Sequence, residues 1–254
     1  MSDSEKHKND PYGEIGSGKP DANAAPPPIP AATVVLLRDI GTPQNGDQTE
    51  IEVLMLRKTS KISFGGMWVF PGGKIDAADY PNAKAPDASE TDQPTPEQTD
   101  IAARNAASRE TMEEANLQLA PTQFIDFAHW TPPPTTPKRF ATWFFLAAGN
   151  HDAIEVDGGE IDDHRWISPA AALALHTNGE IDLVPPTWVS LYQLSQFTSV
   201  AETLEHFKTR TMRRYVTHLA KRSDGVRVAM WDGDAGYDAW NADATGATLS
   251  LIHI

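Results

Sequence analysis

A chain of 254 residues is long enough to bury one sizeable core, and its lack of cysteine excludes a disulfide framework, a thiol nucleophile and cysteine-ligated metal centres. The formal net charge of −14 opposes nucleic-acid binding, so a phosphate-bearing substrate must meet local cations or bound metal. No apolar run approaches the roughly 20 residues of a membrane span, and the start MSDSEKHKND lacks the apolar stretch of a secretory signal. We therefore expect a soluble, cytoplasmic protein that contacts no membrane.

The N-terminal residues contain too little apolar material to form part of a core. Residues 1–30 are polar and then rich in alanine and proline, which predicts a disordered tail. Strand-like and helix-like patterns follow from Ala31 onward. We expect one catalytic domain over residues 31–198 and a C-terminal extension over residues 199–254.

Two aliphatic runs open the expected domain. TVVLLRD (33–39) and IEVLMLRK (51–58) are typical of strands, and the turn-rich segment between them predicts a β-hairpin. MWVFPGGKI (67–75) is a third extended segment. Residues 80–100 are rich in proline, aspartate and threonine, and this composition predicts an inserted surface loop.

The rest of the chain contains both helix-like and strand-like patterns. Small alanines on one face predict a helix over residues 101–115. Further helices are expected in PAAALALHTNG (169–179), 187–197 and 200–208. Further strands are expected in FIDFAHW (124–130), RFATWFFLAAG (139–149), RWIS (165–168), RVAMWDGDAGYDAW (227–240) and TLSLIHI (248–254).

Three carboxylates stand at helical spacing near the end of the first helix. Glu110, Glu113 and Glu114 occupy positions i, i+3 and i+4, so they lie on one face of the helix. A solvated acidic face is the ordinary interpretation of a glutamate-rich helix. A hard divalent cation is the alternative, because Mg²⁺ prefers oxygen ligands and reverses the repulsion between such carboxylates.

The surrounding sequence favours the metal-site interpretation. Gly72 and Gly73 end a strand, where backbone without side chains can approach a metal or a diphosphate. Arg109 can fix a neighbouring carboxylate with forked hydrogen bonds. Lysines and arginines near the strand ends are candidates for contacts to substrate phosphates, namely Arg57, Lys58 and Lys74.

These residues form a recognisable motif. R109-E-T-M-E-E-A-N-L117 resembles the second half of the Nudix box, and G73-K-I-D-A-A-D79 resembles the first half. The usual box has a short spacer between its halves, whereas this chain has residues 80–108 there. Together with FGGMWVFPGGKID and EIDDHRWISPAAALALHTNGEIDLVPPTW, the pattern is similar to the branch that includes the acyl-coenzyme A diphosphatases, whose members also carry a long insertion in the box.

The resemblance implies a fold and a metal site. The fold would be α/β, a Nudix-type α/β/α sandwich around a mixed β-sheet. Glu113 and Glu114 would ligate Mg²⁺ or Mn²⁺ with a backbone carbonyl of Gly72 or Gly73, and Glu110 would ligate metal or act as base toward water. Arg109 would orient a carboxylate. Glu160 is the candidate for a further acid from a distant loop, with Asp162 as its competitor.

Two positions depart from the usual box. Asp79 stands where glutamate is usual, and the shorter side chain predicts that its role in bracing the loop is weakened or taken by another acid. Asn116 replaces the glycine that ends the helix, and asparagine tolerates the left-handed conformation that this turn needs.

The resemblance also implies a reaction. The expected enzyme is a metal-dependent hydrolase that cleaves the diphosphate bond of a nucleotide derivative, in first place coenzyme A or acyl-coenzyme A. ADP-ribose and other nucleotide diphosphates are alternatives, as is a catalytically silent Nudix-like nucleotide-binding regulator. The retention of all three box glutamates argues for activity.

The sequence also offers candidate residues for contacts to the substrate and to a second subunit. Arg57, Lys74 and Arg139 are the candidate substrate-binding cations, with Arg139 assigned to the 3′-phosphate of coenzyme A. A basic residue at a solvated strand start is the equally ordinary interpretation of Arg139. A homodimer is left open, and KTRTMRRY (208–215) is either a helix end or a subunit contact.

Overall fold

The computed structural model describes residues 26–41, 50–59, 65–81, 94–136, 138–149, 153–246 and 252–253. The described chain divides into two compact units. The larger unit comprises Pro30–Ala128 and Thr142–Met212, and the smaller comprises Met1–Ile29, His129–Ala141 and Arg213–Ile254. The larger unit thus continues past residue 198 and leaves out 129–141. The tail expected over residues 1–30 lies almost wholly outside the described residues.

The two aliphatic runs form the centre of a mixed sheet in the larger unit. β1 (Ile29–Ile40) and β2 (Glu50–Lys58) pair antiparallel, with Leu37 opposite Val53. This pairing confirms the expected hairpin, whose connecting loop at 42–49 lies outside the described residues.

Further strands extend this sheet on both sides. The strand path in this unit runs β3-β2-β1-β6-β5. β8 (Arg213–Val216) belongs to the smaller unit. β5 (Ile125–Thr131) and β6 (Phe140–Ala148) match the two predicted strands. β7 (Ile161–Ile167) pairs antiparallel with β2 and begins before the predicted RWIS segment.

The segment that carries the glycine pair contributes two short strands. β3 (Trp68–Val69) pairs with β2, and β4 (Gly72–Lys74) then pairs with β1. Both pairings are antiparallel, and Gly73 lies opposite Ala32. The chain therefore changes its pairing partner at Phe70–Pro71, which brings the glycines beside the central strand.

The long helix begins earlier than its alanine pattern predicted. α1 spans Pro96–Ala115, and a capping box starts it: the Thr95 hydroxyl accepts from the Gln98 amide at 3.2 Å, and the Gln98 side chain accepts from the Thr95 amide at 2.8 Å. The loop prediction was therefore wrong for residues 96–100. Residues 82–93 of that expected loop lie outside the described residues.

The alanine face of α1 explains how closely the helix packs on the sheet. Three alanines lie fully buried in the core that also contains Val34, Leu36, Leu54 and Leu56: they are Ala103, Ala106 and Ala107. Ala102 is fully buried as well. Small side chains let the helix backbone approach the strands, so the charged end of α1 is held against the edge of β4. α1 ends at Asn116, which has φ 54° and ψ 37°, so the expected left-handed turn is confirmed.

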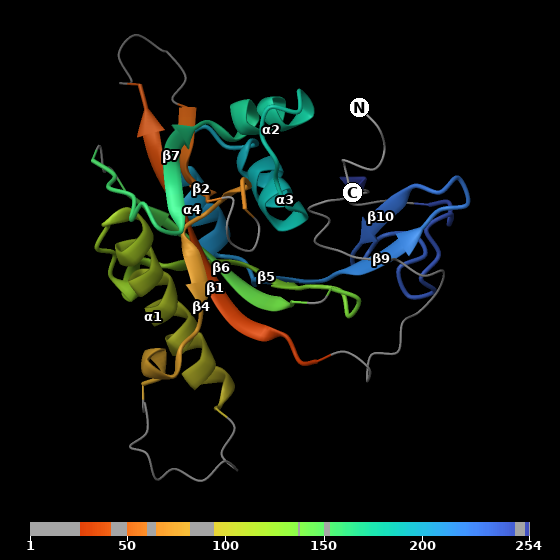
Figure 1. Cartoon of the computed structure of the whole chain (residues 1–254), viewed down its shortest axis with the longest axis horizontal. Helices are drawn as coiled ribbons and strands as arrows, with labels where there is room; N and C mark the ends of the chain where they lie inside the picture. Colours follow the sequence, from red (N-terminus) through yellow and green to blue (C-terminus); the bar gives the residue numbers. More distant parts are fainter. Residues whose placement is uncertain are drawn as a thin grey trace. The chain divides into compact units, whose positions relative to one another are not determined.

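Helices on the other face of the sheet complete the larger unit. α2 (Pro169–Thr177), α3 (Pro185–Leu194) and α4 (Val200–Lys208) match the three predicted helices. Figure 1 shows α1 on one side of the sheet and α2 and α3 on the other. The predicted α/β sandwich is therefore confirmed.

The smaller unit contains a separate three-stranded sheet. β9 (His218–Lys221) and β10 (Arg227–Met230) pair antiparallel, and β11 (Ile252–His253) joins β10. The predicted late strands are thus present but short. Across the described ranges, no helix is long and apolar enough to cross a lipid bilayer.

Candidate active site

The three glutamates in the last two turns of α1 differ in how deeply their side chains are buried. The Glu114 side chain is 6% exposed, the Glu110 side chain 15% and the Glu113 side chain 57%. This gradient follows from helix geometry, because positions i and i+4 face the sheet edge while i+3 is turned toward solvent. The three predicted glutamates therefore lie together, from the sheet outward.

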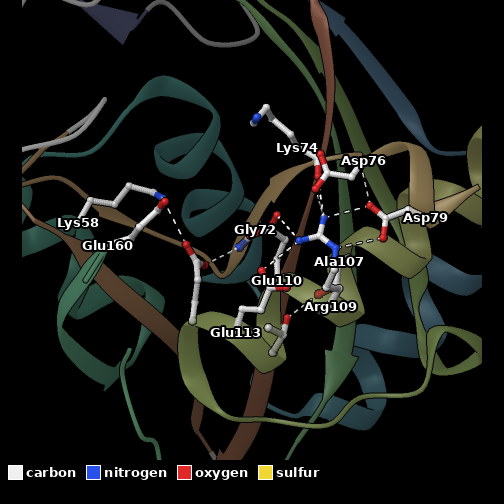
Figure 2. A network of polar contacts seen from close by, with 12 residues as sticks. Lys58, Gly72, Lys74, Asp76, Asp79, Ala107, Arg109, Glu110, Glu113 and Glu160 are labelled. Atoms are coloured by element: carbon white, nitrogen blue, oxygen red, sulfur yellow. Dashed lines mark hydrogen bonds and ion pairs between the residues drawn. The ribbon is translucent and has the colours of Figure 1, made fainter. Parts of the chain in front are cut away.

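Arg109 is the centre of a hydrogen-bond network (Figure 2). Its guanidinium donates to both Asp79 carboxylate oxygens, at 3.1 and 3.0 Å, and to the Lys74 carbonyl at 3.0 Å. It also donates to Glu110 at 2.9 Å and to Glu113 at 3.1 Å. The predicted orienting role of Arg109 has a direct geometric basis, because one side chain binds the loop and two of the three carboxylates.

Asp79 keeps its bracing role despite its shorter side chain. It is 6% exposed, lies in a short 3₁₀ turn (Ala77–Asp79), and also accepts from the Asp76 amide at 2.8 Å. Asp76, a second acid of the same loop, lies farther away, at 3.6 Å from the guanidinium. The expectation that the bracing role is weakened or passes to another acid was wrong, because the 3₁₀ turn carries the shorter carboxylate up to Arg109.

Glu114 is a buried carboxylate with two internal partners. Its Oε2 accepts from the Gly72 amide at 2.9 Å, and its Oε1 lies 3.3 Å from the Lys58 ammonium. Burial raises the pKa of Glu114 to about 7, while Lys58 and the Gly72 amide oppose that shift. Burial likewise raises the pKa of Glu110, against the opposing effect of Arg109. Both carboxyls therefore bind protons more readily than an exposed glutamate does.

Gly72 and Gly73 each lie too close to neighbouring atoms to carry a side chain. A Cβ on Gly73 would collide with the Glu110 carboxylate, and a Cβ on Gly72 would lie 2.6 Å from the Thr33 Cα. The sequence predicted a close backbone approach here, and the backbone meets the helix carboxylates on one side and β1 on the other.

Glu160 and Asp162 have different partners. Glu160 lies 3.7 Å from the Lys58 ammonium, which also contacts Glu114, whereas Asp162 accepts a hydrogen bond from Arg57 at 2.7 Å. These contacts favour Glu160 over its competitor as the acid beside the box glutamates. Sequence reasoning gave Lys58 only a general phosphate-binding role. No local sequence pattern could have found its contacts, because they depend on the pairing of β2 with β7 and on the packing of α1.

The three predicted substrate cations have different surroundings. Arg57 also lies 3.6 Å from Asp163, so two acids neutralise it. The exposed Lys74 side chain points away from Arg109 (Figure 2). In the smaller unit, Arg139 donates to the carbonyls of Pro26 and Pro132, at 2.8 and 3.1 Å. These bonds favour a structural role for Arg139 over the predicted phosphate contact, because its guanidinium already donates hydrogen bonds to backbone carbonyls.

The donor set has the chemistry of a divalent-cation site. The three glutamates supply hard oxygen ligands, and the absent Cβ of Gly73 leaves room for the carboxylate of Glu110. Within the part of the chain that is described, no three acidic or histidine side chains are arranged to hold a metal ion. Instead, Lys58 and Arg109 form ion pairs with the three glutamate carboxylates. The residues therefore fit a metal by the type of their donor atoms, while these ion pairs hold the carboxylates in another arrangement.

Comparison with known proteins gives matches within one family. A NUDIX domain family model matches residues 29–186. The chain is similar to acyl-coenzyme A diphosphatase NUDT19 of Xenopus laevis, with 22% identity over 82% of this chain and 77% of that protein. It is also similar to putative nudix hydrolase 7 of Caenorhabditis elegans, with 25% identity over 59% of this chain and 57% of that protein.

A solved structure with the same fold covers most of the described chain. The crystal structure of a NUDIX hydrolase from Alicyclobacillus acidocaldarius superposes with a TM-score of 0.56. The sequence identity is 23%, over 74% of this chain and 97% of that structure. This likeness concerns the fold.

Proposed function

Because the chain belongs to the NUDIX domain family and is a Nudix hydrolase, we propose that it hydrolyses the diphosphate bond of coenzyme A or acyl-coenzyme A. The observation that carries the proposed chemistry is the Arg109 network, in which one guanidinium joins the two halves of the box and binds Glu110 and Glu113. An array of carboxylates held at fixed positions suits a reaction in which charge on phosphate oxygens must be neutralised.

We assign the ion-binding role to the helix carboxylates. Nudix hydrolases generally use divalent metal ions, and we propose Mg²⁺ or Mn²⁺ for this chain. Glu110, Glu113 and Glu114, with a Gly72 carbonyl, would hold the ion, and Glu160 would complete its acidic surroundings. When bound, such an ion neutralises phosphate charge and lowers the pKa of water.

The protein side chains have separate tasks in this proposal. Glu110 is assigned the removal of a proton from the attacking water as well as a share in ion binding, because its raised pKa suits a proton acceptor. Arg109 keeps Glu110 and Glu113 in place while its other contacts hold the loop through Asp79 and Lys74. No covalent intermediate is needed.

The substrate class is proposed from similarity and from one exposed cation. The Xenopus laevis relative is named as an acyl-coenzyme A diphosphatase, and its similarity covers most of this chain. Lys74 follows the glycine pair directly and is exposed, so we assign to it a contact with substrate phosphate. Arg57 is a weaker candidate, because Asp162 and Asp163 would have to release it.

Steady-state kinetics on matched substrates test the substrate class. With Mg²⁺ present, we expect kcat/KM for coenzyme A to exceed that for ADP-ribose by about tenfold or more. Lys74→Met should raise KM for coenzyme A more than for dephospho-coenzyme A, which lacks the 3′-phosphate. An enzyme that prefers ADP-ribose to both coenzyme A species contradicts the proposed substrate.

A further inference from the structure

Lys58 stands where the sheet meets the carboxylate helix. It is the last residue of β2, at an irregularity in the pairing of β2 with β7 between Arg57 and Lys58. Arg57 contacts the acids of β7, whereas the Lys58 ammonium contacts Glu114 of α1. The Lys58 side chain is only 16% exposed, so its charge is largely withdrawn from water.

The Lys58 ammonium lies between two acids that come from separate elements. It is 3.3 Å from Oε1 of Glu114 and 3.7 Å from Oε2 of Glu160 (Figure 2). Glu114 is buried, whereas Glu160 is 65% exposed. A buried carboxylate needs a compensating positive charge, and Lys58 supplies it without any bound ion.

In the site assigned above, Glu114 would have to offer a divalent ion the same carboxylate that Lys58 contacts. An ammonium in contact with an oxygen of that carboxylate repels the ion and occupies one of the oxygen's lone pairs, so the two cations compete. Other groups hold the backbone around Glu160, so the Lys58 ammonium contributes only to the position of the Glu160 carboxylate. The Glu160 carbonyl accepts from the Thr59 amide at 2.8 Å, and the Asp157 carboxylate accepts from the Glu160 and Ile161 amides.

We propose that Lys58 is a positioning residue that competes with the divalent ion for Glu114, holds Glu160 beside the site, and thereby sets the affinity of the enzyme for its metal. The proposal rests on the metal site assigned above to the α1 carboxylates. Lys58 keeps the metal-free site neutralised and gives up Glu114 when the ion enters. The cost of that exchange lowers metal affinity relative to the same carboxylates without an internal cation.

Calorimetric titration of the full-length, metal-free protein with Mn²⁺ tests this proposal. Lys58→Met removes the charge and keeps the length of the aliphatic stem, so we expect Mn²⁺ to bind about tenfold more tightly than to wild type. Lys58→Arg keeps a positive charge and should bind Mn²⁺ with an affinity within about threefold of wild type. Lys208→Met removes an exposed positive charge from α4 and controls for the change in net charge; its affinity should equal that of wild type.

A purely structural role for Lys58 predicts the opposite direction, because a damaged site binds metal more weakly. Unchanged or weaker Mn²⁺ binding by Lys58→Met overturns the proposal, provided that the variant unfolds cooperatively in urea. Should Lys58→Met not fold, Lys58→Gln carries the same expectation and the same overturning result.

One further variant separates this proposal from the metal-site assignment. Glu114→Gln removes a ligand charge and should weaken Mn²⁺ binding at least about tenfold. Wild-type Mn²⁺ affinity in Glu114→Gln overturns the metal site and the Lys58 proposal together. Weakened binding in Glu114→Gln with unchanged affinity in Lys58→Met overturns the Lys58 proposal alone.

Discussion

Arg109 donates two hydrogen bonds to the carboxylate of Asp79, 30 residues earlier in the chain, at 3.1 and 3.0 Å. This contact joins the two halves of the box, which the insertion separates in the sequence. It fixes the turn after β4 against α1, and the same guanidinium holds Glu110 and Glu113. The geometry of the carboxylates therefore depends on an acid outside the helix.

The first prediction concerns the Asp79–Arg109 contact. Asp79→Asn should lower the free energy of unfolding by about 2 kcal/mol, because it removes the charge of a buried hydrogen-bond partner of Arg109. Asp76→Asn is the matched control, since its carboxylate is 59% exposed and 3.6 Å away; it should cost less than about 0.5 kcal/mol. Urea unfolding measures both, and equal losses in the two variants would contradict the bracing role of Asp79.

The second prediction concerns pH. Burial raises the pKa of Glu114 from an ordinary 4.5 to about 7, with Lys58 and Gly72 opposing the shift. Between these values the folded metal-free protein binds more protons than the unfolded chain, so its stability falls as pH rises. Below pH 4.5 Glu114 is protonated in both the folded and the unfolded state. Above pH 7 it is ionised in both states, and the folded state has lost about 3 kcal/mol of stability.

The Glu114→Gln variant has no ionisable group at this position, so its stability should not show this fall with rising pH. In a chelating buffer we expect it to be more stable than wild type at about pH 8 and equal to it at about pH 4. Glu97→Gln, which changes an exposed glutamate in the first turn of the same helix, controls for the loss of one charge. A difference between Glu114→Gln and wild type that is the same at both pH values would argue against a buried, high-pKa carboxyl.

The third prediction concerns turnover. Glu113→Gln and Glu114→Gln should each lower kcat about 100-fold or more at saturating Mg²⁺, because each removes charge from the proposed ion site, whose assigned task is to neutralise phosphate. Far-ultraviolet circular dichroism should stay unchanged in both variants. Glu97→Gln should retain wild-type kcat. Near-normal turnover in both single variants would remove the metal-site assignment.

The fourth prediction concerns the insertion. Replacing residues 82–93 by a short Gly/Ser linker should leave stability nearly unchanged, because their polar composition predicts a loop and the free-energy cost of closing a loop changes little with its length. Extending the replacement to residue 97 should cost about 1 kcal/mol more, since it removes the Thr95 cap and the first turn of α1. Thermal unfolding of the two variants measures this difference, and equal stability would show that the cap contributes nothing.

Local patterns predicted the elements that carry the site. Helical spacing placed Glu110, Glu113 and Glu114 on one face, and the glycine pair predicted the close approach of β4, because both depend only on residues near in sequence. The start of α1 was missed. The polar composition before residue 101 resembles a loop, and only the Thr95–Gln98 capping box distinguishes it.

Contacts between distant segments could not be predicted from the sequence. Lys58 meets Glu114 and Glu160 because β2 pairs with β7 and packs near α1, and no local pattern specifies that meeting. Arg139 resembled a substrate cation, but its guanidinium binds backbone carbonyls, which have no signature in the side-chain sequence. Asp79 reaches Arg109 through a 3₁₀ turn whose geometry offsets the shorter side chain.

The most direct test of the proposed chemistry is mass spectrometry of the products formed from coenzyme A in ¹⁸O-labelled water with Mg²⁺. The account predicts a phosphopantetheine species and adenosine 3′,5′-bisphosphate, with one ¹⁸O in one of the two products, and release of both products about 100-fold or more slower with Glu114→Gln. Release of inorganic phosphate from intact coenzyme A, unlabelled products, or full cleavage by Glu114→Gln would contradict hydrolysis of the diphosphate at the carboxylates of α1.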